Sequence, residues 1–279
     1  MINVMAKSKQ QNSTDTNNTR IQEIEQQLQD RSYKRGFVPK EQQNVFTIGG
    51  SIIGSLQNFI VFSGLPKAGK STFLHGAIAS NYIPAGLFSM NMNLPIDRKG
   101  ICYIDTESGE YDFYSNIMRI RNMSTRIVLP DDFYSYRFRD CNPVEILYYI
   151  EYLLTNNQNI SVMVVDGLLD LLLNYNDEVE SRKLINWLKK ITTQHNILLI
   201  GVVHTGKKDG LTLGHFGSMV DRYCQSVLMI EKDSKNDLFE LKPKLLRSSG
   251  DFEPIKIKYV AGQYEWVNQP AWSEQNKPF

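Results

Sequence analysis

The clearest chemical signature in this chain lies at residues 64–71, which read GLPKAGKS. The run satisfies G-x-x-x-x-G-K-[ST] and stands where that pattern must stand, after an apolar strand and before a helix. Its glycines let the backbone curl until successive N–H groups converge on phosphate oxygens, and the N-terminus of the helix adds its positive end. The sequence therefore predicts an ATP site contacted by Gly64, Pro66, Lys67, Ala68, Gly69, Lys70, Ser71 and Thr72.

Three polar side chains would meet the charge of the triphosphate. Lys70 is expected to contact the β- and γ-phosphates, and the Ser71 hydroxyl to bind Mg²⁺. A second acid for the metal normally follows an apolar strand, and SVMVVD (161–166) ends in Asp166. The alternative role for Asp166 is to cap a helix. Lys67, inside the loop, either adds charge near the nucleotide or points to solvent.

ATP hydrolysis also needs a carboxylate that polarises the attacking water. We expect this base at the end of a strand beside the strand that precedes the P-loop. The run ICYIDTESGE (101–110) ends an apolar strand in acidic residues, of which Glu107 is the expected base. Asp105 and Glu110 are the rival acids, and the alternative role for Glu107 is to cap the following helix.

A histidine and a basic loop follow another buried strand. In NILLIGVVHTGKKDG (196–210) the strand ends at His204, which is either an ordinary histidine or a sensor of the γ-phosphate. The glycine-rich loop after it carries Lys207, Lys208 and His215. This loop either follows a DNA backbone or is a solvated turn, and we expect DNA contact.

The elements that must position these residues alternate between strands and helices from residue 45 onward. Several apolar runs are continuous, as expected for strands covered on both faces of a sheet. The expected strands are 59–63, 101–105, 133–138, 161–165, 197–203 and 226–231, with a hairpin-like ending at 238–245, 255–260 and 264–267. The expected helices run from about 70 to 82, from a capping box at NPVE (142–145), and through 184–191. The pattern predicts an α/β fold: a mostly parallel twisted sheet flanked by helices, with a C-terminal antiparallel hairpin extension.

One large domain, residues 45–267, accounts for most of the chain. Residues 1–20 are polar and expected to be disordered, because they cannot bury enough apolar surface to offset their ordering entropy. Residues 21–44 form a helix and linker, and residues 268–279 form a tail. The helix, IQEIEQQLQDR, carries an apolar stripe and either folds back on its own domain or docks on a neighbouring subunit.

Composition restricts the class of protein. Lys+Arg 31 and Asp+Glu 30 give a formal net charge of +1, so binding of a polyanion must come from local clusters. Cys102, Cys141 and Cys224 lack C-x-x-C spacing, which argues against disulfides or zinc and is typical of a reducing compartment. The longest central apolar stretch, SVMVVDGLLDLLL, is too short and too charged to span a bilayer, and no signal peptide begins the sequence. We therefore expect a cytoplasmic protein without a membrane partner.

The order of these motifs resembles that of RecA-fold ATPases: GLPKAGKS, a strand ending IDTE, SVMVVD, a strand ending VVH, then a glycine-rich loop and HFGSMVDRYCQSVLMIEKD. The chain is similar in particular to the RepA-like ATPases of plasmids and mobile elements, which are related to hexameric helicases of the DnaB type. The resemblance covers roughly residues 45–267. It implies Glu107 as the water-activating residue, His204 as the sensor and the following loop as a DNA-facing element in the channel of a ring.

In such rings the nucleotide lies between subunits, and a basic finger from the neighbour completes the site. The resemblance offers Arg247 for this role, with Lys244 close by in KPKLLRSSGDFEP (242–254). An arginine that reaches the γ-phosphate in trans would stabilise the charge that develops during transfer. The alternative for Arg247 is a surface arginine in a hairpin. The chain departs from the recombinases of this group, where a glutamine commonly stands in place of His204.

These observations predict a Mg²⁺-dependent ATPase that assembles into a homo-oligomeric ring, expected to be a hexamer. Hydrolysis would drive translocation on single-stranded DNA, unwinding or remodelling, in the replication or mobilisation of a plasmid or mobile element alongside other proteins of that process. An alternative is an ATP-switched oligomeric binding module without motor activity. A metabolic P-loop kinase is disfavoured, because no lid for a small-molecule acceptor is recognisable.

Overall fold

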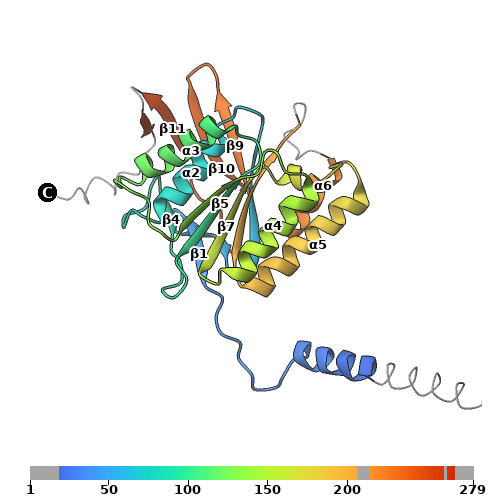
Figure 1. Cartoon of the computed structure of the whole chain (residues 1–279). Coiled ribbons are helices and arrows are strands. Elements are labelled where there is room, and N and C mark those ends of the chain that lie inside the picture. The colour runs from blue at the N-terminus through green and yellow to red at the C-terminus, as the bar shows by residue number, and fades with distance from the viewer. Residues whose placement is uncertain (1–18, 207–213, 261–262, 268–279) are drawn as a thin grey trace, which may run out of the picture. The chain divides into compact units, whose positions relative to one another are not determined.

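The computed structural model describes residues 19–206, 214–260 and 263–267 of the chain (Figure 1). The chain divides into two compact units, residues 1–41 and 42–279. The described part of the first unit contains one helix, residues 19–31, where a helix was predicted. This helix includes residues 19 and 20, which the sequence analysis assigned to a disordered tail, so it begins before the first apolar residue of its stripe. The rest of the two predicted tails lies outside the described residues.

The second unit is built on a sheet of nine strands in the order β12-β11-β10-β9-β3-β8-β7-β5-β6. The six strands from β9 to β6 are parallel, and β10, β11 and β12 extend the sheet in antiparallel fashion. Every expected strand is confirmed, as is the mostly parallel α/β class with its antiparallel C-terminal extension. The strands are β3 (Asn58–Gly64), β5 (Gly100–Asp105), β6 (Phe133–Arg137), β7 (Ile160–Asp166), β8 (Leu198–His204), β9 (Ser226–Asp233), β10 (Leu238–Leu246), β11 (Ile255–Val260) and β12 (Gln263–Trp266).

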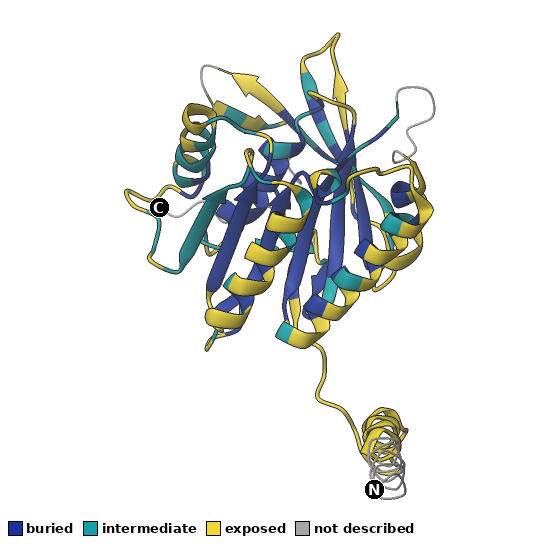
Figure 2. Ribbon diagram, turned by 45° about the vertical axis from the view of Figure 1, so that its right-hand side comes forward, coloured by how far each residue is buried: buried dark blue, intermediate teal, exposed yellow. Residues whose placement is uncertain are grey.

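Helices cover both faces of this sheet (Figure 1). One face packs on α2 (Lys70–Ser80) and α3 (Glu110–Met123), and the other on α4 (Pro143–Asn156), α5 (Glu178–His195) and α6 (Gly214–Tyr223). The central strands are buried and the outer helix faces are exposed (Figure 2). The three expected helices are confirmed, and α4 begins with the predicted capping box of Asn142 and Glu145.

A second, antiparallel sheet of three strands was not predicted. It has the order β2-β1-β4, with β1 (Asn44–Ile48), β2 (Ser51–Ser55) and β4 (Met90–Met92). Met90 and Met92 share a core cluster with Phe73 of α2, and Phe46 of β1 contacts Phe62 of β3, so this sheet packs against both α2 and the large sheet. The helix that follows the P-loop is therefore buried along nearly its whole length.

Two helices were also missed. α3 was missed because Ile120 is its single fully buried residue, so its sequence shows little apolar periodicity. α6 begins at Gly214, so His215, which was expected in the glycine-rich loop after His204, lies in a helix. Within the described ranges, every helix is too short or too polar to cross a bilayer.

Candidate phosphate and metal site

The P-loop connects β3, which ends at Gly64, to α2, which begins at Lys70. Gly69 has a left-handed backbone with φ 91°, and a Cβ there would lie 2.5 Å from Cδ1 of Phe239. A Cβ on Gly64 would lie 2.4 Å from the backbone oxygen of Ile230 on β9. Both glycines of the motif are therefore required by local sterics. The first turn of α2 holds no acidic residue, so nothing there neutralises the positive end of the helix.

Lys70, His204 and Glu107 form one hydrogen-bonded chain where the parallel strands end. Nζ of Lys70 lies 3.0 Å from Nδ1 of His204, and Nε2 of His204 lies 3.2 Å from Oε1 of Glu107. The same Nζ donates to the backbone oxygens of Gly64 and Leu65, at 3.1 and 2.8 Å. Because an ammonium group only donates, Nδ1 of His204 accepts from Lys70, and the Nε2–H group donates to Glu107. His204 thus touches both the P-loop lysine and the expected base.

The two charged ends of this chain have shifted pKa values. Burial lowers the pKa of Lys70, although the carboxylates of Glu107 and Asp166 act to raise it. The hydrogen bond from His204 lowers the pKa of Glu107, against the opposing effect of burial. Glu107 is therefore held in the ionised form that a water-polarising carboxylate requires.

Glu107 reaches this position from a strand that is not beside the P-loop strand, so the expected adjacency is wrong. The neighbours of β3 are β8 and β9, and β5 is separated from β3 by β8 and β7. Glu107 lies two residues beyond the end of β5, in the connection to α3. This connection carries the carboxylate across the end of β7 to His204 at the end of β8, which no pattern in the sequence could indicate.

The rival acids occupy different environments. Asp105 is 1% exposed and accepts from the N–H groups of Glu107 and Ser108 at 3.0 and 2.8 Å, so it shapes the loop that carries the base. Glu110 is exposed at the first position of α3. Gly109 is the N-cap of α3 and makes no side-chain cap bond, so Glu107 does not cap that helix. Of the three acids, Glu107 is the one that contacts His204.

Asp166 and Ser71 are the residues that could hold a metal. Asp166 ends β7 at 8% exposure and is hydrogen-bonded by the Ser71 side chain. Burial, and then the nearby Asp105, raise the pKa of Asp166 to about 7, and a bound cation would favour its ionised form. In the part of the chain that the structure describes, no group of three or more His, Cys, Asp or Glu side chains could hold a metal by itself. A hydroxyl and a carboxylate suit Mg²⁺, which takes its other ligands from phosphate and water.

A pocket of about 320 Å³ joins these residues. Lys67, Gly69, Lys70, Ser71, Thr72, Glu107, Asp166 and His204 line it, together with three residues that the sequence analysis missed, Val202, Phe239 and Tyr264. The Thr72 hydroxyl donates to the Tyr264 hydroxyl at 3.1 Å, so β12 closes one side of the pocket. Phe239 and Tyr264 lie in the predicted hairpin, where their spacing indicated strands and nothing more.

A second pocket, of about 700 Å³, shares Tyr264 with the first. Its walls come from α3, which contributes Tyr114 and Arg119, and from the β11–β12 pair, which contributes Tyr259. Aromatic rings and hydrogen-bonding side chains therefore lie beside the phosphate pocket.

Arg247 and Lys244 lie away from the P-loop of their own chain. The Arg247 N–H donates to the backbone oxygen of Gln225, and the Gln225 N–H donates to that of Phe59, near the start of β3. Nζ of Lys244 lies 2.9 Å from Oδ2 of Asp221 on α6. Neither side chain lines the pocket at the P-loop.

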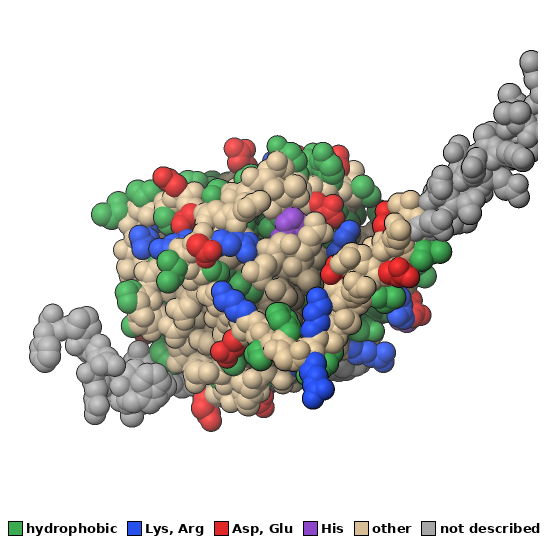
Figure 3. All heavy atoms as spheres, turned by 90° about the horizontal axis from the view of Figure 1, so that it is seen from below, with side chains coloured by type: hydrophobic (Ala, Val, Ile, Leu, Met, Phe, Trp, Pro, Cys, Tyr) green, Lys and Arg blue, Asp and Glu red, His purple; other side chains and the backbone are tan. Residues whose placement is uncertain are grey.

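The predicted basic loop lies partly outside the described residues. Lys207 and Lys208 lie outside the described residues, and His215 is exposed in the first turn of α6. Viewed from below, the molecule shows basic and acidic side chains interspersed, without a broad area of one sign (Figure 3). The described residues on that face therefore form no basic stripe for a polyanion.

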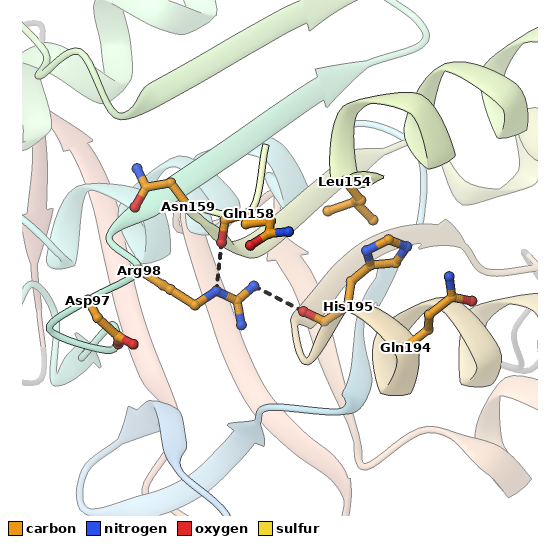
Figure 4. A pocket seen from close by; sticks show the side chains of 7 residues that line it. All are labelled: Asp97, Arg98, Leu154, Gln158, Asn159, Gln194 and His195. Atoms are coloured by element: carbon orange, nitrogen blue, oxygen red, sulfur yellow. Dashed lines mark hydrogen bonds between the residues drawn. The ribbon is translucent and has the colours of Figure 1, made fainter. Parts of the chain in front are cut away.

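A pocket of about 530 Å³ lies elsewhere, around Arg98 (Figure 4). The Arg98 guanidinium donates to the backbone oxygens of Gln158, Ile160, His195 and Asn196. It ties the C-terminus of α5 to the start of β7 and satisfies carbonyl groups that the helix leaves open. Arg98 therefore has a structural role at this pocket, because its guanidinium binds backbone oxygens.

A scan against protein-family models and a search of curated proteins found no match to this chain. The geometry itself defines what the site can do. It presents a loop with the P-loop pattern at a helix N-terminus, a hydroxyl and a carboxylate that could hold a hard cation, and an ionised glutamate linked by His204 to Lys70.

Proposed function

We propose that this chain is a Mg²⁺-dependent ATPase with a RecA-like core. The observation that carries the proposal is the hydrogen-bonded chain of Lys70, His204 and Glu107 beside the P-loop. A phosphate cradle alone would support nucleotide binding and no more. The ionised glutamate, held at the same pocket by the strand-end histidine, adds the group needed to orient water.

The strand order supports the RecA-like assignment. The P-loop strand β3 lies beside β8, which ends in His204, and β8 lies beside β7, which ends in Asp166. In parallel sheets, ligands bind outside the carboxyl ends of the strands. The P-loop, Glu107, Asp166 and His204 all lie at that end.

Within this proposal each residue has one task. Bound Mg²⁺ would neutralise phosphate charge, with Ser71 and Asp166 as its protein ligands. Lys70 would bind the terminal phosphates, and Glu107 would orient the attacking water. His204, bonded to both Lys70 and Glu107, would transmit the presence of phosphate to the loop that follows β8.

The pocket that shares Tyr264 would take the nucleoside. Tyr114, Tyr259 and Tyr264 offer ring faces on which a base can stack, and Arg119 offers hydrogen-bond donors. At about 700 Å³ the pocket is large enough for a purine nucleoside.

The rest of the proposal concerns assembly and DNA. We infer a cytoplasmic homo-oligomeric ring, in which Arg247 of one subunit, with Lys244 near it, completes the site of the next. Within one chain these side chains lie away from the P-loop, as trans-acting residues would. Lys207, Lys208 and His215 would contact single-stranded DNA, in replication or mobilisation of a mobile element together with other proteins of that process.

Two measurements test the function. ATP turnover by the full chain, with and without single-stranded DNA, should show hydrolysis that DNA stimulates and that Lys207→Ala with Lys208→Ala leaves unstimulated. Light scattering with an ATP analogue should show an oligomer, and a monomer under all conditions would remove the role of Arg247. Turnover without stimulation at any salt concentration would favour the alternative, an ATP-switched binding module.

A further inference from the structure

Two acidic side chains face one another beneath the phosphate pocket. Asp105 and Asp166 are direct partners in the register of the parallel strands β5 and β7. They are 1% and 8% exposed. Like charges directly opposite one another in a sheet are destabilising, and burial removes the water that would screen them. Hydrogen-bond donors from the protein stabilise the ionised forms of such a pair.

Tyr103 supplies a donor that touches both acids. It lies on β5 two residues before Asp105, on the same face of the sheet, and is fully buried. Its hydroxyl lies 3.2 Å from Oδ2 of Asp105 and 3.4 Å from Oδ2 of Asp166. A phenol has one proton, so Tyr103 can donate to one carboxylate at a time.

His75 decides whether that proton is available. This histidine lies on α2, five residues after Lys70, and is fully buried with Nε2 3.4 Å from the Tyr103 hydroxyl. Its Nδ1 atom has no hydrogen-bond partner among the described residues. A proton on Nδ1 would leave a buried N–H group unpaired, which native structures rarely tolerate. We therefore assign the neutral tautomer protonated at Nε2, which donates to the Tyr103 oxygen and leaves the phenol proton for the carboxylates.

Asp105 extends the cluster to the expected base. Its Oδ1 atom accepts from the N–H groups of Glu107 and Ser108, and its Oδ2 atom accepts from Asn116 at 3.1 Å. A shift of the Asp105 carboxylate would therefore move the loop that carries Glu107.

We propose that Tyr103 is a positioning residue that couples the metal-binding acid Asp166 to the loop carrying Glu107, and that His75 orients the Tyr103 hydroxyl. The roles of Asp166 and Glu107 rest on the proposed ATPase function, whereas the contacts among the side chains do not. The cluster links the helix of the P-loop, the metal acid and the base loop through one phenol.

Hydrogen–deuterium exchange without nucleotide tests the positioning directly. Tyr103→Phe removes the hydroxyl, and His75→Leu removes the donor that orients it. In both variants, peptides spanning residues 106–109 should exchange about fivefold faster, the factor that corresponds to one net hydrogen bond. His75→Gln, whose amide can still donate, should restore slow exchange.

Tyr136→Phe is the matched control, because it also removes a phenol hydroxyl. Tyr136 lies on the neighbouring strand β6, where it pairs with Ile104 of β5, and it is outside the cluster. It should leave exchange at 106–109 unchanged. Equal exchange in Tyr103→Phe, Tyr136→Phe and the wild type would overturn the proposal. If Tyr103→Phe does not fold, the comparison of His75→Leu with His75→Gln decides, since equal exchange in those two overturns it as well.

A second arm separates this inference from the proposed function. Binding of a fluorescent ATP analogue is titrated with Mg²⁺, and Tyr103→Phe should need about fivefold more Mg²⁺ for half-saturation while Mg²⁺-free binding stays unchanged. Wild-type protein that binds no nucleotide would overturn the ATPase proposal, and exchange at 106–109 would still decide the positioning role. Nucleotide binding with the same Mg²⁺ dependence in both proteins would overturn the coupling to Asp166.

Discussion

The buried imidazole of His75 should make the unfolding free energy fall as the solution becomes acidic. Burial, with a smaller contribution from the positive charge of Arg119, lowers the pKa of His75 from 6.5 to about 3. The unfolded chain takes up a proton below its pKa of 6.5, while the folded chain does not until the pH approaches 3. The unfolded state therefore binds more protons in this window, and stability is lost as the pH falls from 6.5 toward 3.

The magnitude follows from the two pKa values. Between pH 7.5 and pH 5.5, protonation of His75 in the unfolded state should lower the unfolding free energy by about 1.4 kcal/mol. The carboxyl of Asp166, with a pKa raised to about 7, titrates in the same window with the opposite sign, because its folded state takes up the proton first. The comparison must therefore be made against a variant that keeps Asp166 and lacks the imidazole.

Urea unfolding followed by circular dichroism at both pH values provides the assay. The stability of the wild type relative to His75→Leu should fall by about 1.4 kcal/mol from pH 7.5 to pH 5.5. His75→Gln also has no titrating group, so it should give the same pH-dependent fall even if its absolute stability differs. A relative stability that stays constant between the two pH values would show that His75 protonates freely in the folded protein, and the reasoning from burial would be refuted.

Other substitutions test separate parts of the structure. Gly69→Ala places a Cβ at a left-handed position against Phe239. Urea unfolding should show a loss of about 1–3 kcal/mol, and titration with a fluorescent nucleotide should show weaker binding. Arg98→Lys cannot reproduce the guanidinium fork on four backbone oxygens, and urea unfolding should show a loss of about 1–3 kcal/mol. Asp221→Asn removes the charge that pairs with the half-buried Lys244, so the free energy of unfolding should fall by about 1 kcal/mol. This loss should disappear when the substitution is made together with Lys244→Met.

The parallel core was predictable because its strands are buried on both faces. Continuous apolar runs such as SVMVVD carry their own signal, and the P-loop motif marks the junction of a strand with a helix. The small sheet was not predictable, since β4 has three residues and β1 and β2 have five each. α3 buries one residue fully, so its apolar periodicity is weak.

Some residues of the site were predictable from the sequence, and others were not. Residues at strand ends, such as Asp166 and His204, follow from the order of motifs. Strand order in space does not, which is why Glu107 was expected beside the P-loop strand and lies three strands away. His75 and Tyr103 lie within apolar runs, where single polar side chains are indistinguishable from ordinary core residues until the fold brings them to the acids.

The measurement that tests the central claim most directly is Mg²⁺-dependent ATP turnover by the full chain, paired with binding of a fluorescent ATP analogue. The wild type should hydrolyse ATP, and Lys70→Ala should lose both binding and turnover. Glu107→Gln keeps the shape of the base and removes its charge, so it should retain binding while turnover falls by about 10²–10⁴-fold. Turnover by Glu107→Gln equal to that of the wild type, or wild-type protein that binds no ATP, would contradict the account.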